Sequence, residues 1–175
     1  MERVIATPRL ILREFELSDA KKMYGLNNDL DVLKYTGDSS FKSIEHAKQF
    51  LKNYSDYKKN GYGRWAVILK SNNEFIGWCG LKLNEDEKVD IGFRFFKEYW
   101  NQGYATESAL ACLQYGFRHL KISEIIGRAS VENKPSIKVL EKIQMIYWKT
   151  ETYEEIGSAA FYKLSAKEYD TTLNI

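Results

Sequence analysis

The sequence predicts an α+β fold in which a mixed, mostly antiparallel central sheet lies between two layers of helices. Three apolar runs, at 64–70, 75–83 and 89–95, are separated by short polar turns, as in a meander of antiparallel strands. An amphipathic helical pattern then covers 104–120 and leads into a further strand at 124–131. A strand, a helix and a strand in that order need a crossover, so the strands on either side of this helix are expected to pair in parallel.

Length and composition set limits on the kind of protein. A chain of 175 residues, 44% of them hydrophobic, fits one domain over 1–175 with a sizeable core. We find no apolar run long enough to span a bilayer and no secretory leader, so a cytoplasmic protein without membrane attachment is expected. The formal net charge of +2 is too small to recruit nucleic acid. The spacing of Cys79 and Cys112 suits neither zinc nor a disulfide framework, so no metal is expected. The chain is expected to act as a monomer or a homodimer.

The first half of the chain is expected to contain a strand and two helices. The strand covers 10–14, and Ser18 with Asp19 caps the short helix that follows. A second helix begins after Ser43, and its apolar residues keep helical spacing as far as Tyr57.

The end of the chain is expected to form a short helix and a hairpin. Asn133 is placed to cap the helix at 136–143. The hairpin strands are expected at 147–156 and 160–165, with the turn at 157–158.

The stretch Tyr99 to Ser108, YWNQGYATES, indicates an anion-binding site. It joins a strand to the long helix through a loop with one glycine and no basic residue. The first N–H groups of a helix lack intrahelical partners, and the helix dipole adds positive potential at the same place. We therefore expect the loop to hold an anion through its backbone.

Gly92 lies in the middle of the strand at 89–95, where glycine usually marks a β-bulge or a close approach of another chain or a ligand. If the sheet splays from its parallel neighbour at a bulge there, unpaired backbone groups of the strand can bind a peptide-like ligand by strand addition. A ligand with amides at one end and phosphates at the other describes coenzyme A.

Three motifs of the sequence resemble those of a known family. TPRLILR at 7–13, GYATES at 103–108 and N-x-x-S at 133–136 occur in one chain in the order and spacing of the GNAT N-acetyltransferase superfamily. Nearly the whole chain resembles its ribosomal-protein alanine N-acetyltransferase-like branch. The resemblance implies a splayed GNAT sheet and an enzyme that uses acetyl-CoA as co-substrate. It also implies that a primary amine attacks the acetyl group directly in a ternary complex.

The resemblance also implies the residues that bind acetyl-CoA. The pyrophosphate is expected on the backbone amides of Gln102, Gly103, Tyr104, Ala105 and Thr106. The pantetheine is expected along Phe93 and Phe95, and its thiol end near Asn133 and Ser136. Trp100 stands where the superfamily has Gln or Arg.

The catalytic groups are less clearly marked. Leu140 stands where many members of the superfamily have a general-acid tyrosine, so Ser136 or water is expected to protonate the leaving thiolate. Asp90 is the first candidate for a base, relaying a proton through water, and Glu132 is the second. A strand amide such as that of Phe93 is expected to polarise the thioester carbonyl.

Acceptor chemistry favours an α-amine. Deprotonating an α-amine at pH 7 costs about 1 kcal/mol, whereas a lysine side chain costs about 4.6 kcal/mol. The branch that the chain resembles implies the amino terminus of a peptide or protein as acceptor, and the absence of an acid tyrosine at Leu140 suits an amine that needs so little deprotonation. Asp29, Asp31 and Asp38 either attract a cationic substrate or belong to a solvated loop. The alternatives are a small-molecule N-acetyltransferase acting on polyamines or aminoglycosides, and a non-catalytic acyl-CoA-binding module.

Overall fold

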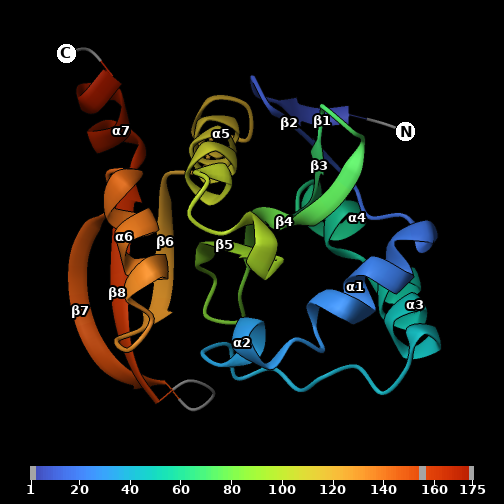
Figure 1. The fold of residues 1–175 in the computed structure, drawn as a ribbon. Coiled ribbons are helices and arrows are strands. Elements are labelled where there is room, and N and C mark those ends of the chain that lie inside the picture. The colour runs from blue at the N-terminus through green and yellow to red at the C-terminus, as the bar shows by residue number, and fades with distance from the viewer. Residues whose placement is uncertain (1–2, 154–156, 174–175) are drawn as a thin grey trace.

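A computed structural model describes residues 3–153 and 157–173 and shows one eight-stranded sheet between helices (Figure 1). The strand order is β1-β2-β3-β4-β5-β6-β8-β7, and every neighbouring pair is antiparallel except β5 and β6. The strands are β1 (Arg3–Ala6), β2 (Leu10–Arg13), β3 (Arg64–Leu69), β4 (Glu74–Leu83), β5 (Val89–Phe95), β6 (Glu124–Ser130), β7 (Ile146–Tyr153) and β8 (Gly157–Ser165). The predicted α+β class and the parallel crossover are confirmed.

Helices cover both faces of the sheet. They are α1 (Ala20–Leu26), α2 (Leu30–Leu33), α3 (Ile44–Asn53), α4 (Asp56–Asn60), α5 (Tyr104–Arg118), α6 (Lys134–Lys142) and α7 (Ala166–Leu173), with 3-10 turns η1 (Leu17–Asp19) and η2 (Lys97–Tyr99). Alternate residues of β3 divide between two cores: Trp65 and Val67 pack with α5, whereas Ala66 and Ile68 pack with α1 and α3. The sheet is therefore the middle of three layers.

The sheet opens between β5 and β6. Their parallel pairing begins at Val89 with Ile125 and ends at Ile91 with Gly127. Beyond that point β6, β8 and β7 diverge from β4 and β5 in Figure 1, and the edge of β5 from Gly92 onward faces the opening.

The expected bulge at Gly92 is absent from the ladder between β4 and β5, which keeps one register from one end to the other. Gly92 instead makes room for an arginine. A Cβ atom on this residue would lie 2.7 Å from the guanidinium carbon of Arg64. The expected splay is present, and it occurs where the parallel ladder stops.

The single helix expected after Ser43 is two helices. The chain turns extended at Tyr54, with ψ at 107°, and α4 starts two residues later. Two tyrosine hydroxyls hold this break: the Tyr54 hydroxyl accepts a 2.7 Å hydrogen bond from the Arg64 amide, and the Tyr57 hydroxyl donates to the Arg64 carbonyl. The two tyrosines are spaced as in one continuous helix, so their contacts with Arg64 could not be predicted from the sequence.

Asp19 precedes α1 without a side-chain hydrogen bond to that helix, and its side chain instead takes part in a capping box at η1, within which Ser18 lies. The Asp19 carboxylate accepts two 2.7 Å hydrogen bonds from the buried guanidinium of Arg13 and one of 2.8 Å from the amide of Glu16. A buried ion pair of this kind ties β2 to the start of α1.

The carboxy-terminal hairpin is present, but its turn lies elsewhere. Gly157 and Ser158 belong to β8 and pair with Tyr153 and Thr152 of β7. The connection at 154–156, which was expected to extend the first strand, lies outside the described residues. The elements β1 and α2 were not predicted, because each spans only four residues, too few for a clear periodicity, and α7 was not predicted either.

Candidate active site

Two cavities meet at the opening between β5 and β6. The helix-start cavity has a volume of about 570 Å³ and lies among the edge of β5, the loop before α5, and α6. The sheet-face cavity, of about 1170 Å³, lies over β3, β4 and β5 on the side of α1 and α3. Six residues line both cavities and define the junction: Tyr35, Thr36, Phe93, Arg94, Asn133 and Ser136.

The start of α5 offers free amides to the helix-start cavity. Gly103, with φ at +81°, precedes the helix and has no side chain to cap it. The amide of Glu107 donates to the Gly103 carbonyl, so the amides of Tyr104, Ala105 and Thr106 precede the first intrahelical bond. All three residues line the cavity. Such a helix start is suited to an anion.

The open edge of β5 lines the same cavity. The amide of Phe96 donates to the Ile76 carbonyl, and alternation along an antiparallel pair then directs the amides and carbonyls of Phe93 and Phe95 away from β4. The indole of Trp100 donates a 2.8 Å hydrogen bond to the Phe95 carbonyl. Trp100 therefore occupies one acceptor of the edge and leaves the groups of Phe93 facing the opening.

Basic side chains from other elements surround the helix-start cavity. Lys138 and Lys142, one turn apart on α6, line it together with Lys34, Lys97 and Arg94, against one acid, Asp31. The resulting positive field suits a ligand with several phosphate charges. The (i, i+4) spacing of the α6 lysines was visible in the sequence, but it did not show which way they face.

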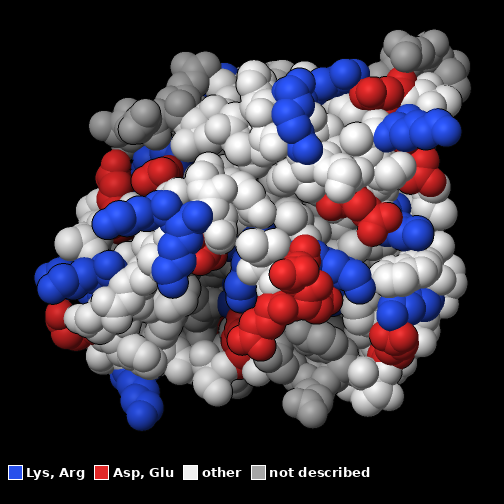
Figure 2. Space-filling view, turned by 180° about the vertical axis from the view of Figure 1, so that it is seen from behind, with Lys and Arg blue, Asp and Glu red and all other residues white. Residues whose placement is uncertain are grey.

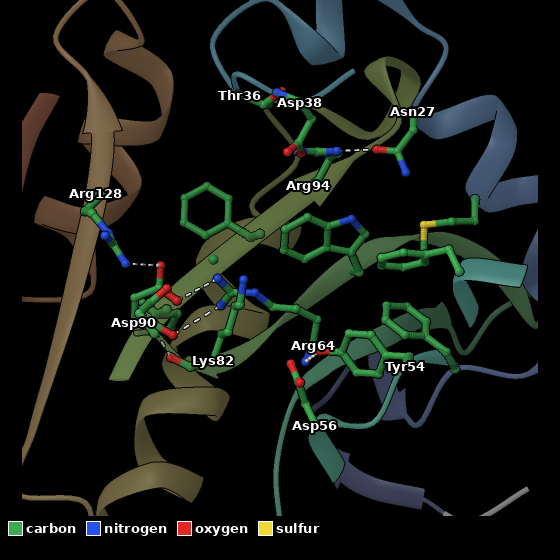
Figure 3. A pocket seen from close by; sticks show the side chains of 18 of the residues that line it. Asn27, Thr36, Asp38, Tyr54, Asp56, Arg64, Lys82, Asp90, Arg94 and Arg128 are labelled. Carbon is green, nitrogen blue, oxygen red and sulfur yellow. Dashed lines mark hydrogen bonds and ion pairs between the residues drawn. The ribbon is translucent and has the colours of Figure 1, made fainter. Parts of the chain in front are cut away.

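In the sheet-face cavity, Asp90 lies between two arginines. Figure 3 shows Arg64 and Arg128 approaching its carboxylate from opposite sides, at 2.7 Å and 3.4 Å. Arg64 also donates a 3.2 Å hydrogen bond to the Asp90 carbonyl. Asp90 is only 9% exposed, so the three charges are held together largely out of water.

A third arginine, Arg94, reaches the junction from β5. Its guanidinium donates to Asn27 and to Asp38 and lies 5.2 Å from the ring centroid of Trp78 (Figure 3). The guanidinium of Arg64 lies 5.5 Å from the same ring. Trp78 thus holds two arginines over the face of the sheet.

The acids expected to attract a cationic substrate already have local contacts. Asp29 accepts a 2.9 Å bond from the amide of Asp31 and caps α2. Asp31 pairs with Lys97, and Asp38 pairs with Arg94. The hydrogen bond from Lys97 lowers the pKa of Asp31. These contacts favour a structural role for the three acids.

The remaining predicted residues fall into two groups. Asn133 and Ser136 lie at the junction, and the Asn133 side chain accepts a 3.2 Å bond from the Ser136 amide, so the predicted cap is confirmed. Glu132 is exposed and is not part of either cavity lining. Leu140 is 2% exposed and packs closely against Gly127, since a Cβ atom added to Gly127 would lie 2.7 Å from the Leu140 side chain. The position of the general-acid tyrosine is therefore occupied by an apolar side chain in the core.

Tyr35 and Thr36 were missed by the sequence analysis. They follow α2 and lie more than fifty residues before β5 and α6 in the sequence, yet they line the same junction. Their sequence carries no catalytic motif, and only the tertiary structure brings Tyr35 and Ser136 to the same junction.

Within residues 3–153 and 157–173, no group of three His, Cys, Asp or Glu side chains could hold a metal ion. No helix of the same residues is long and apolar enough to cross a membrane. Cys79 and Cys112 are free and buried, with their sulfurs 3.7 Å apart. Figure 2 shows acidic and basic side chains interspersed over the rear face, with acidic ones gathered near its centre.

Comparison with known families gives one match over most of the chain. Residues 9–146 match the family model described as "Acetyltransferase (GNAT) domain". A curated relative, "Uncharacterized N-acetyltransferase YnaD" of Bacillus subtilis, is 37% identical over 143 residues, which is 81% of each chain.

Solved structures agree with this match. A GNAT-family acetyltransferase from Bacillus anthracis superposes with a TM-score of 0.81 at 31% identity, covering 94% of this chain and 99% of that one. Spermidine N-acetyltransferase from Vibrio cholerae, in complex with CoA and spermine, has a TM-score of 0.79 at 19% identity and covers 93% and 99%. At 19% identity, the likeness to the Vibrio cholerae enzyme shows a shared fold and nothing about the substrate.

Proposed function

We propose that this chain, which belongs to the GNAT acetyltransferase family and is an acetyl-CoA-dependent N-acetyltransferase, acetylates the α-amine of a peptide or protein amino terminus. The observation that carries the proposal is the wide sheet-face cavity, which joins the helix-start cavity at the junction. Its volume of about 1170 Å³ suits several residues of a peptide. The ribosomal-protein alanine branch remains a prediction within this proposal.

The arginines of the sheet-face cavity suit the carbonyl oxygens of a peptide. Four basic residues line the cavity, Arg64, Arg94, Arg128 and Lys82, together with five acids, of which Asp38 and Asp90 are already paired with arginine. The other three acids, Asp56, Glu85 and Asp86, would attract a polyamine, so the charges alone do not decide between the two acceptors. A peptide brings one amine and a series of carbonyl oxygens, which guanidinium groups can bind as donors.

We assign the acetyl-CoA contacts to the helix-start cavity. The pyrophosphate would lie on the amides from Gln102 to Thr106, of which residues 103–106 line the cavity and Gln102 does not, with Lys138 and Lys142 adding positive charge. The open backbone of Phe93 and the cavity face of Phe95 would contact the pantetheine. Asn133 and Ser136 would then lie near its thiol end, at the junction.

Acetyl-CoA supplies the activated acetyl group, and the protein positions the groups around it. The Phe93 amide would donate to the thioester carbonyl oxygen as it gains charge. The hydroxyl of Ser136 or of Tyr35 would pass a proton to the departing thiolate at the junction and take one in return, through water, from the amine nitrogen after its attack. The α-amine needs little help, because a substantial fraction of it is already free near neutral pH.

We propose that Asp90 orients Arg64 and Arg128 and does not accept the proton of the amine. Both of its carboxylate oxygens are in ion pairs, and proton transfer to either would weaken a buried charge pair. The sequence alone favoured a base because it did not show these two partners.

Asp90→Asn tests this role. We expect the acceptor KM to rise about tenfold, because the two arginines lose their common anion. The ratio of wild-type to variant kcat/KM should stay constant from pH 6.5 to pH 9, since arginine remains protonated throughout. A ratio that shrinks toward pH 9, measured on one amino-terminal peptide, would instead support a proton relay through Asp90.

Removing the two hydroxyls at the junction tests the proton donors. Ser136→Ala and Tyr35→Phe are each expected to lower kcat about tenfold, and acetyl-CoA affinity should stay within about twofold of wild type. The effect is modest because a thiolate with a pKa near 8.5 is a fair leaving group. Steady-state kinetics at saturating acetyl-CoA measure it, with Ser71→Ala as control, because Ser71 is exposed in the turn between β3 and β4 and lines neither cavity. Wild-type kcat in both variants would show that neither hydroxyl protonates the thiolate and would favour water as the donor.

The acceptor class is tested by a competition screen. Peptides with varied first residues, polyamines and aminoglycosides are incubated with the protein and acetyl-CoA, and products are identified by mass spectrometry. Acetylation on the peptide α-amine supports the proposal, whereas faster acetylation of spermidine or of an aminoglycoside contradicts it. Acetyl-CoA binding with no product from any amine would indicate an acyl-CoA-binding module.

A further inference from the structure

We infer that Thr7, Arg9 and Glu107 form a clip that holds the loop before α5 in the shape that binds acetyl-CoA, with Arg9 as the positioning residue. This inference rests on the proposed place of the pyrophosphate at that loop. The clip joins two motifs that are a hundred residues apart in the sequence, the TPRLILR segment and the GYATES helix start.

Glu107, in the first turn of α5, is the centre of the clip. Its Oε1 accepts a 2.5 Å hydrogen bond from the Thr7 hydroxyl and one of 2.9 Å from the Arg9 amide. Its Oε2 accepts a 2.6 Å bond from the Arg9 Nε. Burial favours a higher pKa for Glu107, but the hydrogen bonds from Thr7 and Arg9 outweigh it and lower the pKa. The carboxylate is thus held in its charged form against the turn between β1 and β2.

From this anchor Arg9 reaches three consecutive residues of the loop. Its Nη1 donates a 2.9 Å hydrogen bond to the Gln102 carbonyl, and its guanidinium carbon lies 4.4 Å from the ring centroid of Tyr104. A Cβ atom on Gly103 would lie 3.3 Å from the Arg9 Nη2. None of the three clip residues lines the helix-start cavity, so they contact the loop from its outer side.

The bond to Gln102 fixes the direction of a backbone donor. In a trans peptide the carbonyl and the next N–H point in opposite directions, and the described residues contain no cis bond. Because Arg9 holds the Gln102 carbonyl on the outer side, the Gly103 amide points the other way, toward the cavity. Gly103 has φ at +81°, in a left-handed region that glycine adopts readily, and the contact with Arg9 would favour this conformation over the others open to glycine.

Arg9 also cancels a charge. Glu107 lies one turn from the amides proposed to hold the pyrophosphate, and an unpaired carboxylate there would repel it. The ion pair with Arg9 neutralises that charge. Loss of Arg9 should therefore harm acetyl-CoA binding through both the loop and the charge, whereas simultaneous loss of Glu107 should restore the electrostatic part.

This double-variant behaviour provides the test, with acetyl-CoA affinity measured by isothermal titration calorimetry on the full chain. Arg9→Met, which keeps the length of the side chain, is expected to raise Kd about 30-fold, and Arg9→Met with Glu107→Gln only about fivefold. Arg9→Lys keeps the charge but loses the fork geometry, and a rise of about fivefold is expected. Arg118→Met, at the other end of α5 in an ion pair with Asp170, is the control and should bind as wild type does.

The outcomes separate this inference from the proposed site. Wild-type affinity in both Arg9→Met and Arg9→Lys would overturn the clip while leaving acetyl-CoA binding intact. A double variant that binds no better than Arg9→Met would overturn the charge argument. If Gly103 and Ala105 substitutions left acetyl-CoA affinity unchanged, the pyrophosphate site itself would fail. Circular dichroism of each variant checks the fold, and Arg9→Lys keeps the test decisive if Arg9→Met is unstable.

Discussion

Replacing Gly103 by proline is expected to raise the dissociation constant for acetyl-CoA at least about 100-fold, a loss of roughly 3 kcal/mol. Gly103 has φ at +81°, whereas the proline ring fixes φ near about −65°. The substitution also removes one backbone donor. Both effects displace the amides of the first turn of α5, where the pyrophosphate is proposed to bind.

A second substitution separates the lost donor from the distorted loop. Ala105 is the second residue of α5, where the helix tolerates proline because the N–H has no intrahelical acceptor. Ala105→Pro should raise Kd about tenfold, since one hydrogen bond to a charged group contributes about 1.5–3 kcal/mol. Glu45→Pro is the matched control, because Glu45 occupies the same position in α3. Calorimetry showing equal affinity in the Ala105 and Glu45 variants would argue against backbone recognition of the phosphates.

The glycine loop that opens α5 could be predicted because its signal is local. A strand, a single-glycine loop and a helix start follow each other within about twenty residues, and their geometry depends little on the rest of the chain. The cap by Asn133 and the crossover between β5 and β6 are local in the same sense. The splay was predicted from Gly92, but the reason was different: the glycine makes room for Arg64 and does not form a bulge in the ladder with β4.

The sheet-face cavity could not be predicted, because its charges come from separate elements. Arg64 lies on β3, Asp90 on β5 and Arg128 on β6, and nothing in the spacing of these residues indicates that they meet. Asp90 alone suggests a base, and Asp90 between two guanidinium groups suggests an anchor. Tyr35 shows the same limit, since a tyrosine in an irregular loop has no periodicity that could place it at the junction.

The amine specificity should appear as a difference in pH dependence between two peptides. The acceptors are a peptide with a free amino terminus and no lysine, and a peptide with a blocked amino terminus and one lysine. If the amine loses its proton to water before it attacks, ionisation alone favours the α-amine about 300-fold at pH 7 and about 25-fold at pH 9.

The sign follows from the two ordinary pKa values. Below a pKa of about 7.8 the free α-amine increases tenfold for each pH unit, and above it the concentration levels off. A lysine side chain keeps gaining free amine up to a pKa of about 10.4, so its kcat/KM should still rise where that of the α-amine is flat. A plateau for the amino-terminal peptide above pH 8.5, together with a continuing rise for the lysine peptide, is the expected result. Faster acetylation of the lysine peptide at pH 7 would show that the protein itself deprotonates the acceptor and that the α-amine is not its preferred substrate.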